Sequence, residues 1–241
     1  MKRHVETSIF REIVEAVAYA REARRAVAIS GAPGLGKTHA LTWIFEREPL
    51  AAYWSVPTAR ARLKGATKAI VEALGYRAAA EHCDQLWEQL EAILEGCEGD
   101  AFLIIDEAQR LPLDILVEIV DFPERHGFPV VIAGNPELLR RTRVKSGAFD
   151  QISSRCAKQV TLRKPLPDDL NILAADFDVT GKEARDAAIA YGLNTSIREL
   201  VTLLEAARGV AGRAPVHLSE LRMAAKFSKG DRGLSLLKPD A

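Results

Sequence analysis

The chain has 241 residues, 48% of them hydrophobic, enough to bury the core of one large domain or of a core domain with a small satellite. Its 33 basic and 33 acidic residues balance, so a polyanionic partner would have to be held by a local basic patch. Three cysteines without metal-ligand spacing favour neither a disulfide framework nor a zinc site. The first ten residues are mixed and charged, and no aliphatic stretch approaches bilayer length. We therefore expect a cytoplasmic protein without a membrane partner.

Strand and helix patterns alternate along the first two thirds of the chain. Apolar residues at helical spacing from Ile9 to Val17 predict an amphipathic helix, which precedes a buried strand over 26–30. The next predicted elements are a helix over 38–47, a strand over 51–56, helices over 63–74 and 86–94, a strand over 101–105, a helix over 112–124, and strands over 130–133 and 159–162. This alternation predicts an α/β fold with a parallel sheet covered by helices on both faces.

The segment that joins the first strand to the next helix matches the phosphate-binding pattern GxxxxGK[ST] in full. Its glycines allow a tight turn and bring backbone N–H groups against phosphate oxygens. We expect Lys37 to be exposed in the loop and to reach the β and γ phosphates, and Thr38 to offer a hydroxyl to Mg²⁺. The predicted nucleotide-binding residues are Gly31, Ala32, Pro33, Gly34, Leu35, Gly36, Lys37, Thr38 and His39.

Two acids, Asp106 and Glu107, directly follow the wholly apolar third strand. This arrangement resembles a Walker B motif, at the sheet edge where open parallel sheets bind ligands. In that role Asp106 would hold Mg²⁺, largely through the water shell of the ion, and Glu107 would orient the water that attacks the γ phosphate. The alternative is a pair of surface acids at a strand end, and the phosphate loop makes it a minor one.

The pattern changes after Arg163, where two prolines interrupt the chain and only helical periodicity follows. Capping-box pairs that begin helices are Thr180 with Glu183 and Ser196 with Glu199. We therefore predict an α/β domain over residues 1–165, a small all-helical lid domain over 166–228 and a disordered tail over 229–241.

Three further polar residues bear on the chemistry. Asn135 lies just past the fourth strand, where its amide could bind the attacking water or the γ phosphate; a turn former before proline is the alternative. Arg155 precedes the fifth strand, and Arg198 lies in the first turn of the helix that Ser196 caps. Each arginine, taken alone, also fits a solvated surface residue.

The phosphate loop, the sequence Leu-Ile-Ile-Asp-Glu-Ala-Gln, Asn135, Ser-Ser-Arg-Cys and the helical lid follow one another as in AAA+ ATPases, and this resemblance covers nearly the whole chain. It implies ATP as the nucleotide, sensor 1 at Asn135 and sensor 2 at Arg198. It also implies that Arg155 is an arginine finger supplied to a neighbouring subunit. Such a finger implies self-assembly, because it completes the site of the next protomer.

Among AAA+ proteins, the run from Asp106 to Leu111 and the sequence Val-Ile-Ala-Gly-Asn-Pro-Glu-Leu resemble the DNA transposition ATPases, with the MuB family of Mu-like phages closest and IstB and TnsC as cousins. The resemblance implies an ATP-dependent oligomer or helical filament on duplex DNA. This assembly would select or deliver target DNA to a transposase, and hydrolysis would drive its disassembly. The alternatives are a clamp-loader-like or secretion-associated AAA+ ATPase, and a scaffold that does not hydrolyse its nucleotide.

If the resemblance holds, lysines and arginines would contact the DNA backbone without reading bases. One basic cluster follows the second strand, one follows Asn135, and a third, weaker one ends the lid; a solvated helix face is the alternative for each. The first is preferred, because its residues resemble those that face DNA in related filaments. The clusters are Arg60, Arg62, Lys64 and Lys68; Arg140, Arg141, Arg143 and Lys145; and Arg222, Lys226 and Lys229.

Overall fold

The computed structural model forms two compact units, an α/β unit and a helical unit. The structure describes residues 4–57, 62–79, 82–97, 101–140, 152 and 154–238. The α/β unit comprises Glu12–Gly31 and Lys37–Leu162, and the helical unit comprises Met1–Arg11, Ala32–Gly36 and Arg163–Ala241. The division after Leu162 lies close to the predicted boundary after residue 165.

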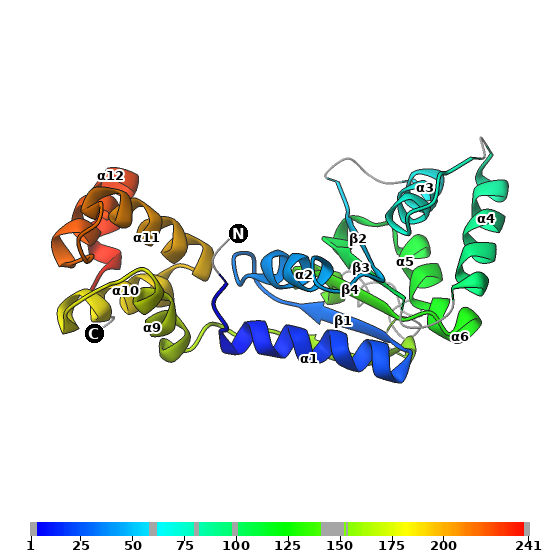
Figure 1. Ribbon diagram of the computed structural model, residues 1–241, viewed down its shortest axis with the longest axis horizontal. Coiled ribbons are helices and arrows are strands. Elements are labelled where there is room, and N and C mark those ends of the chain that lie inside the picture. Colours follow the sequence, from blue (N-terminus) through cyan, green and yellow to red (C-terminus); the bar gives the residue numbers. More distant parts are fainter. Residues whose placement is uncertain are drawn as a thin grey trace. The chain divides into compact units, whose positions relative to one another are not determined.

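Five parallel strands form one sheet in the order β2-β3-β4-β1-β5 (Figure 1). The strands are β1 Ala26–Ser30, β2 Ala51–Ser55, β3 Phe102–Asp106, β4 Val130–Gly134 and β5 Cys156–Thr161. The three inner strands, β3, β4 and β1, are buried along their whole length, and for this reason their sequences are continuous apolar runs. The predicted α/β class with a parallel sheet is confirmed.

Helices of the α/β unit cover both faces of this sheet (Figure 1). One face, which includes Ile105 and Ile132, shares a buried core with α3, α4 and α5. On the other face, Arg21 of α1 lies 4.9 Å from the ring centre of Phe102, and the ring of Phe45 in α2 lies 5.6 Å from that of Tyr53. These helices are α1 Ser8–Ala23, α2 Lys37–Phe45, α3 Leu63–Ala73, α4 Cys83–Gly96 and α5 Leu113–Val120.

The helix predicted over 112–124 is in fact two helices, α5 and α6 (Phe122–His126), which meet at Asp121. Pro123 lies in the first turn of α6 and has no N–H to donate to the preceding turn, so the first helix cannot continue through it. Phe122 at this junction is fully buried and packs against the ring of Trp87, 6.1 Å away. Two shorter helices, η1 Ala108–Arg110 and α7 Glu137–Arg140, follow β3 and β4.

Four helices make up most of the helical unit: α9 Pro167–Asp176, α10 Lys182–Asn194, α11 Ile197–Ala211 and α12 Leu218–Leu236. The predicted cap of α11 is confirmed, since the Ser196 hydroxyl accepts a hydrogen bond from the Glu199 N–H at 3.2 Å. The predicted cap at Thr180 is wrong. The Thr180 N–H donates to the Val216 carbonyl, which keeps it in an extended pairing, and Gly181, with φ of 95°, begins α10 instead.

The predicted disorder of residues 229–241 is wrong for residues 229–236, because α12 extends to Leu236, while residues 239–241 lie outside the described residues. Gly230 takes φ of 59° and ψ of −143°, which kinks the helix there. Beyond the kink, Gly233 lies directly against the Ala225 carbonyl oxygen. Such an approach leaves no room for a side chain, so the glycines that weaken the helical pattern in the sequence allow this close packing.

We expect Gly233→Ala to destabilise the helical unit, because the added Cβ would overlap the Ala225 carbonyl oxygen, a backbone atom with little freedom to move. Overpacking of this kind costs about 1–3 kcal/mol. Gly209→Ala in α11 is the matched control: its Cβ meets nothing within 4 Å, and alanine favours a helix by up to about 1 kcal/mol. Urea unfolding should move in opposite directions for the two variants, and a shared direction would contradict this packing.

Candidate nucleotide-binding site

The predicted phosphate loop connects the end of β1 to the first residue of α2. Gly34 and Gly36 have φ of 83° and 92°, in the left-handed region that favours glycine, and the turn depends on them. The Gly31 N–H donates to the Gly134 carbonyl at 3.2 Å, which fixes the start of the loop against the end of β4. At the other end, the positive end of the dipole of α2, which begins at Lys37, favours an anion.

Lys37 is buried, with 8% of its surface exposed, and the expectation of an exposed lysine is therefore wrong. Its ammonium group donates to the carbonyl of Gly31 at 2.7 Å, so the side chain at the end of the loop bonds back to the first residue of the loop. This contact holds the positive charge within the loop, beside the N–H groups that would bind phosphate.

Asp106 is the most deeply buried acid of the predicted site, with 1% exposure. One carboxylate oxygen accepts from the Thr38 hydroxyl at 2.6 Å and from the Tyr53 hydroxyl at 3.3 Å. The other accepts from the Glu107 N–H at 2.8 Å. The Thr38 hydroxyl and the Asp106 carboxylate are the hard oxygen ligands that Mg²⁺ prefers, so this pair fits the predicted metal role.

Tyr53 of β2 was not among the predicted residues, although it contacts Asp106. Burial, and next the negative charge of Asp106, raise the pKa of Tyr53 to about 12. The phenol therefore remains a neutral hydrogen-bond donor to the carboxylate across the physiological range.

Glu107 begins η1 with φ of 57°, a left-handed conformation that is uncommon for a residue with a side chain. Its carboxylate accepts from the Gln109 amide at 2.7 Å and pairs with the Arg110 guanidinium at 3.2 Å. Arg110 in turn donates to the Val56 carbonyl, just past the end of β2, at 2.7 Å. The sequence prediction assigned no role to Gln109 or Arg110, because only the turn at Glu107 brings their side chains to its carboxylate.

Asn135 lies at the same edge of the sheet as Glu107, directly after β4. Its side-chain oxygen accepts from the Glu137 N–H at 2.9 Å and so begins α7, the turn-forming role that the sequence left open. The sensor 1 role of Asn135 stays a prediction.

Arg155 lies at the opposite edge of the sheet. The next residue, Cys156, pairs with Ala26 at the start of β1, whereas the phosphate loop follows the end of that strand. Five strand residues span roughly 15 Å, so the structure does not bring Arg155 to the phosphate loop of its own chain. Its guanidinium instead pairs with Asp121 at 3.1 Å.

Arg198 lies in the helical unit together with the middle of the phosphate loop. Its backbone N–H donates to the Gly34 carbonyl at 3.0 Å. A side chain at Gly34 would lie 2.7 Å from the Ser196 hydroxyl, so glycine is also needed there for close approach. The start of α11 therefore contacts the phosphate loop within this unit. Arg198, whose backbone makes this contact, has an exposed side chain.

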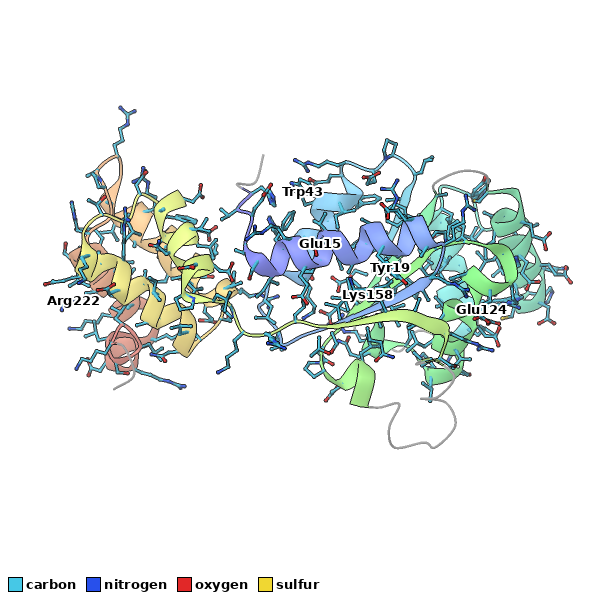
Figure 2. All side chains as sticks on the ribbon, turned by 90° about the horizontal axis from the view of Figure 1, so that it is seen from below. Glu15, Tyr19, Trp43, Glu124, Lys158 and Arg222 are labelled. Carbon is cyan, nitrogen blue, oxygen red and sulfur yellow. The ribbon has the colours of Figure 1, made fainter. Side chains whose placement is uncertain are left out.

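The basic clusters are described only in part. In the first, Arg62, Lys64 and Lys68 are exposed at or near the start of α3, and Lys68 lies 3.7 Å from Glu72. In the third, Arg222 lies on the surface of the helical unit (Figure 2), while a hydrogen bond to Glu199 raises the pKa of Lys229. Outside the described residues lie Arg60, Arg141, Arg143 and Lys145, together with the side chain of Arg140.

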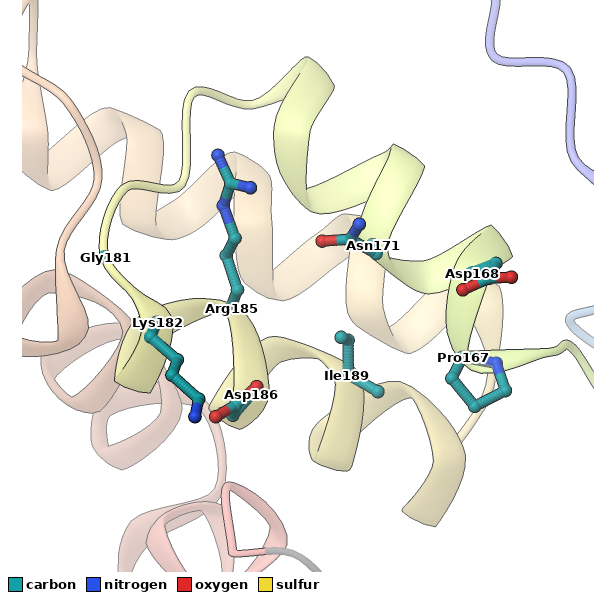
Figure 3. Close-up of a pocket in the computed structure, with 8 residues that line it drawn as sticks. All are labelled: Pro167, Asp168, Asn171, Gly181, Lys182, Arg185, Asp186 and Ile189. Atoms are coloured by element: carbon teal, nitrogen blue, oxygen red, sulfur yellow. The ribbon is translucent and has the colours of Figure 1, made fainter.

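A pocket of about 460 Å³ lies between α9 and α10 in the helical unit (Figure 3). Acidic and basic side chains line it together, among them Asp168, Lys182, Arg185 and Asp186. None of its lining residues belongs to the predicted nucleotide-binding motifs. In the described part of the chain, no helix is both long and apolar enough to span a membrane.

Residues 20–142, a little over half of the chain, match the family model of the AAA domain. The chain belongs to this family. It is 27% identical over 195 residues to the Mu-like prophage FluMu DNA transposition protein B of Haemophilus influenzae, covering 75% of this chain and 63% of that protein. It is 26% identical over 186 residues to the ATP-dependent target DNA activator B of Escherichia phage Mu, covering 75% and 58%. The predicted resemblance to MuB is confirmed, and the chain spans less than two thirds of the length of these relatives.

Solved structures of AAA+ proteins share the fold of this AAA chain. The Aeropyrum pernix ORC1 protein in complex with DNA superposes with a TM-score of 0.70 at 18% identity, covering 95% of this chain and 68% of that one. The RuvB Holliday junction branch migration motor of Thermotoga maritima superposes with a TM-score of 0.56 at 19% identity, covering 91% and 68%. At this level of identity the likeness establishes the fold.

We expect Lys37→Ala to weaken ATP binding about 10- to 100-fold, because a hydrogen bond to a charged group contributes about 1.5–3 kcal/mol. Lys158→Ala is the control, since Lys158 lies on the edge strand β5, 5.5 Å from the ring of Tyr19 (Figure 2). Titration with a fluorescent ATP analogue checks both variants. Wild-type affinity in a folded Lys37→Ala protein would exclude Lys37 from the nucleotide site.

Proposed function

We propose that this protein is an ATP-dependent DNA-binding ATPase that assembles on duplex DNA and selects or delivers target DNA to a transposase. Hydrolysis of ATP would drive disassembly. The observation that carries the ATPase part is the contact of Thr38 with the buried Asp106, beside the carboxylate of Glu107. The DNA transposition part is supported by the relatives, which are named a DNA transposition protein and a target DNA activator.

Each residue of the nucleotide-binding site has a separate role in the proposed binding and hydrolysis of ATP. The N–H groups of the phosphate loop and Lys37 bind the phosphates, and Thr38 and Asp106 hold Mg²⁺, which when bound neutralises phosphate charge. Glu107 orients and polarises the attacking water. We assign a sensor role to Asn135, whose backbone N–H donates to the side chain of Gln109, which in turn contacts Glu107. We assign a second sensor role to Arg198, whose backbone N–H donates to the Gly34 carbonyl of the phosphate loop.

Arg155 fits a role on a neighbouring protomer because it lies at the sheet edge opposite its own phosphate loop. An arginine at that edge can reach a nucleotide only when the loop of a second copy is brought to it. We therefore propose that the active form is an ATP-dependent oligomer or filament in which Arg155 of one protomer stabilises the transition-state charge in the next.

The DNA surface that we propose begins at the first basic cluster. Arg62 and Lys64 follow the carboxyl end of β2, the same edge of the sheet that carries Asp106 and Glu107. Their exposed side chains are of the kind that binds backbone phosphates, and Lys68 is partly neutralised by Glu72. We expect binding without sequence preference, because phosphate contacts carry no direct sequence information.

We expect duplex DNA to stimulate ATP hydrolysis and to bind with a steep salt dependence. Each phosphate contact contributes a slope of about −0.9 to log affinity against log salt, so replacing Arg60, Arg62 and Lys64 by alanine should flatten the slope by about two to three units. Fluorescence anisotropy with ATP over a range of salt concentrations measures this.

The control replaces three exposed lysines outside the basic clusters, Lys164, Lys182 and Lys238, by alanine, which removes the same charge. An unchanged salt slope in the Arg60, Arg62 and Lys64 variant would exclude this cluster as the DNA-binding surface. The cluster from Arg140 to Lys145 would then be the next candidate. Hydrolysis that DNA does not stimulate would favour a different AAA+ role.

We expect Arg155→Ala to bind ATP normally and to lose about 10³- to 10⁵-fold in DNA-stimulated turnover, the range measured for arginine fingers. Mixing it with Lys37→Ala should restore part of the activity, because a Lys37→Ala protomer still donates its own Arg155. Steady-state hydrolysis at several mixing ratios checks this. Arg125→Ala is the control, since Arg125 also pairs with Asp121. Verified co-assembly without any rescue would rule out a finger in trans.

A further inference from the structure

The Gln109 side chain joins the ends of two neighbouring strands. Its amide nitrogen donates to the Glu107 carboxylate at 2.7 Å, just past β3. Its amide oxygen accepts from the Asn135 N–H at 3.2 Å, just past β4. Only 9% of Gln109 is exposed, so both hydrogen bonds are largely shielded from water, where they orient their partners most strongly.

The two partners of Gln109, the Glu107 carboxylate and the Asn135 N–H, need opposite hydrogen-bonding groups, and a primary amide supplies both. An ionised carboxylate only accepts hydrogen bonds, and a backbone N–H only donates. Glutamine offers a donor and an acceptor at the end of one side chain. Glutamate would keep the acceptor for Asn135 but would lose the donor and face Glu107 with a second negative charge.

Gly134, the last residue of β4, makes room for this bridge. A Cβ at Gly134 would overlap the Gln109 amide oxygen and lie 3.2 Å from Leu138. The backbone of Gly134 is outside the left-handed region, so its conformation alone would accept alanine. The glycine is therefore explained by the close approach of Gln109.

Glu107 needs such support because its carboxylate is otherwise loosely held. One third of its side chain is exposed, and its other described partner, Arg110, is 36% exposed. Solvent screens a partly exposed ion pair, so this pair fixes the carboxylate less firmly than a shielded hydrogen bond does. A water-activating group must be placed closely, since a displacement of about 1 Å can cost about 100-fold in rate.

We propose that Gln109 is a positioning residue, which fixes the Glu107 carboxylate against the end of β4 and so sets where the attacking water is activated. This inference rests on the proposed ATPase function. Because the same amide holds the Asn135 N–H, Gln109 also keeps Glu107 and the proposed sensor 1 in one constant arrangement.

The test compares Gln109→Met, which keeps the length without hydrogen bonds, with Gln109→Glu, which keeps only the acceptor. We expect kcat to fall about 10- to 100-fold in the first and further in the second, with KM within about twofold and unchanged affinity for a fluorescent ATP analogue. The control is Gln89→Met in α4. Gln89 also joins two backbone groups, Arg77 and Ala79, but lies outside the site.

Gly134→Ala adds a second, independent route to the same change. It leaves the chemistry of Gln109 intact but displaces its amide, so kcat should again fall about tenfold or more. Adding Gly134→Ala to Gln109→Met should lower kcat by much less than Gly134→Ala does alone, because the bridge is already absent and only the contact with Leu138 remains; two losses that multiply would show that Gly134 acts separately.

Wild-type kcat in Gln109→Met, or a loss of kcat that only follows a lower Tm, would overturn the positioning role. Absence of hydrolysis in the wild-type protein would instead overturn the proposed function, and the two failures are therefore distinguishable.

Discussion

The buried carboxylate of Asp106 is the constraint on which the nucleotide site depends. Removing an ionised group from water is costly unless hydrogen bonds replace the lost hydration. Three donors do so here: the Thr38 hydroxyl from α2, the Tyr53 hydroxyl from β2 and the Glu107 N–H from the chain after β3. Satisfying one charge therefore aligns the end of the phosphate loop, the neighbouring strand and the turn that carries Glu107.

At this edge of the sheet, the neighbouring strands β2 and β3 lead to different parts of the proposed mechanism. β2 leads to Arg62 and Lys64 at the start of α3, and β3 leads to Glu107. Arg110 contacts the segments that follow both strands: it donates to the Val56 carbonyl after β2 and pairs with the Glu107 carboxylate after β3. The chain after β2, which leads to the proposed DNA surface, is thus connected through Arg110 to the carboxylate that we propose activates water. Coupling between DNA binding and hydrolysis needs no longer path through the core.

The features predicted correctly from the sequence are those that local chemistry decides. Continuous apolar runs identified the inner strands, and the glycines of the loop identified the turn between β1 and α2, because each pattern has few other uses. The failures have tertiary causes. Thr180 pairs with Val216, far along the chain, and Gly233 packs against Ala225 across a kink. The burial of Lys37 and the bridge by Gln109 likewise depend on groups that only the folded chain brings together.

Asp121 has a bearing on how an assembly could form. An arginine finger that moves to the phosphate of a neighbouring protomer breaks its ion pair within its own chain. The acid of that pair would then be a partly buried charge without a partner, which is costly in free energy. Asp121 is 18% exposed, yet it contacts both Arg155 and Arg125, at 3.1 and 3.6 Å. When Arg155 leaves, Arg125 remains to neutralise Asp121, and Arg125 is itself held by Glu91 and Glu118. The second arginine thus lowers the cost of releasing the first, so the contact of Arg155 with Asp121 is compatible with a role in trans.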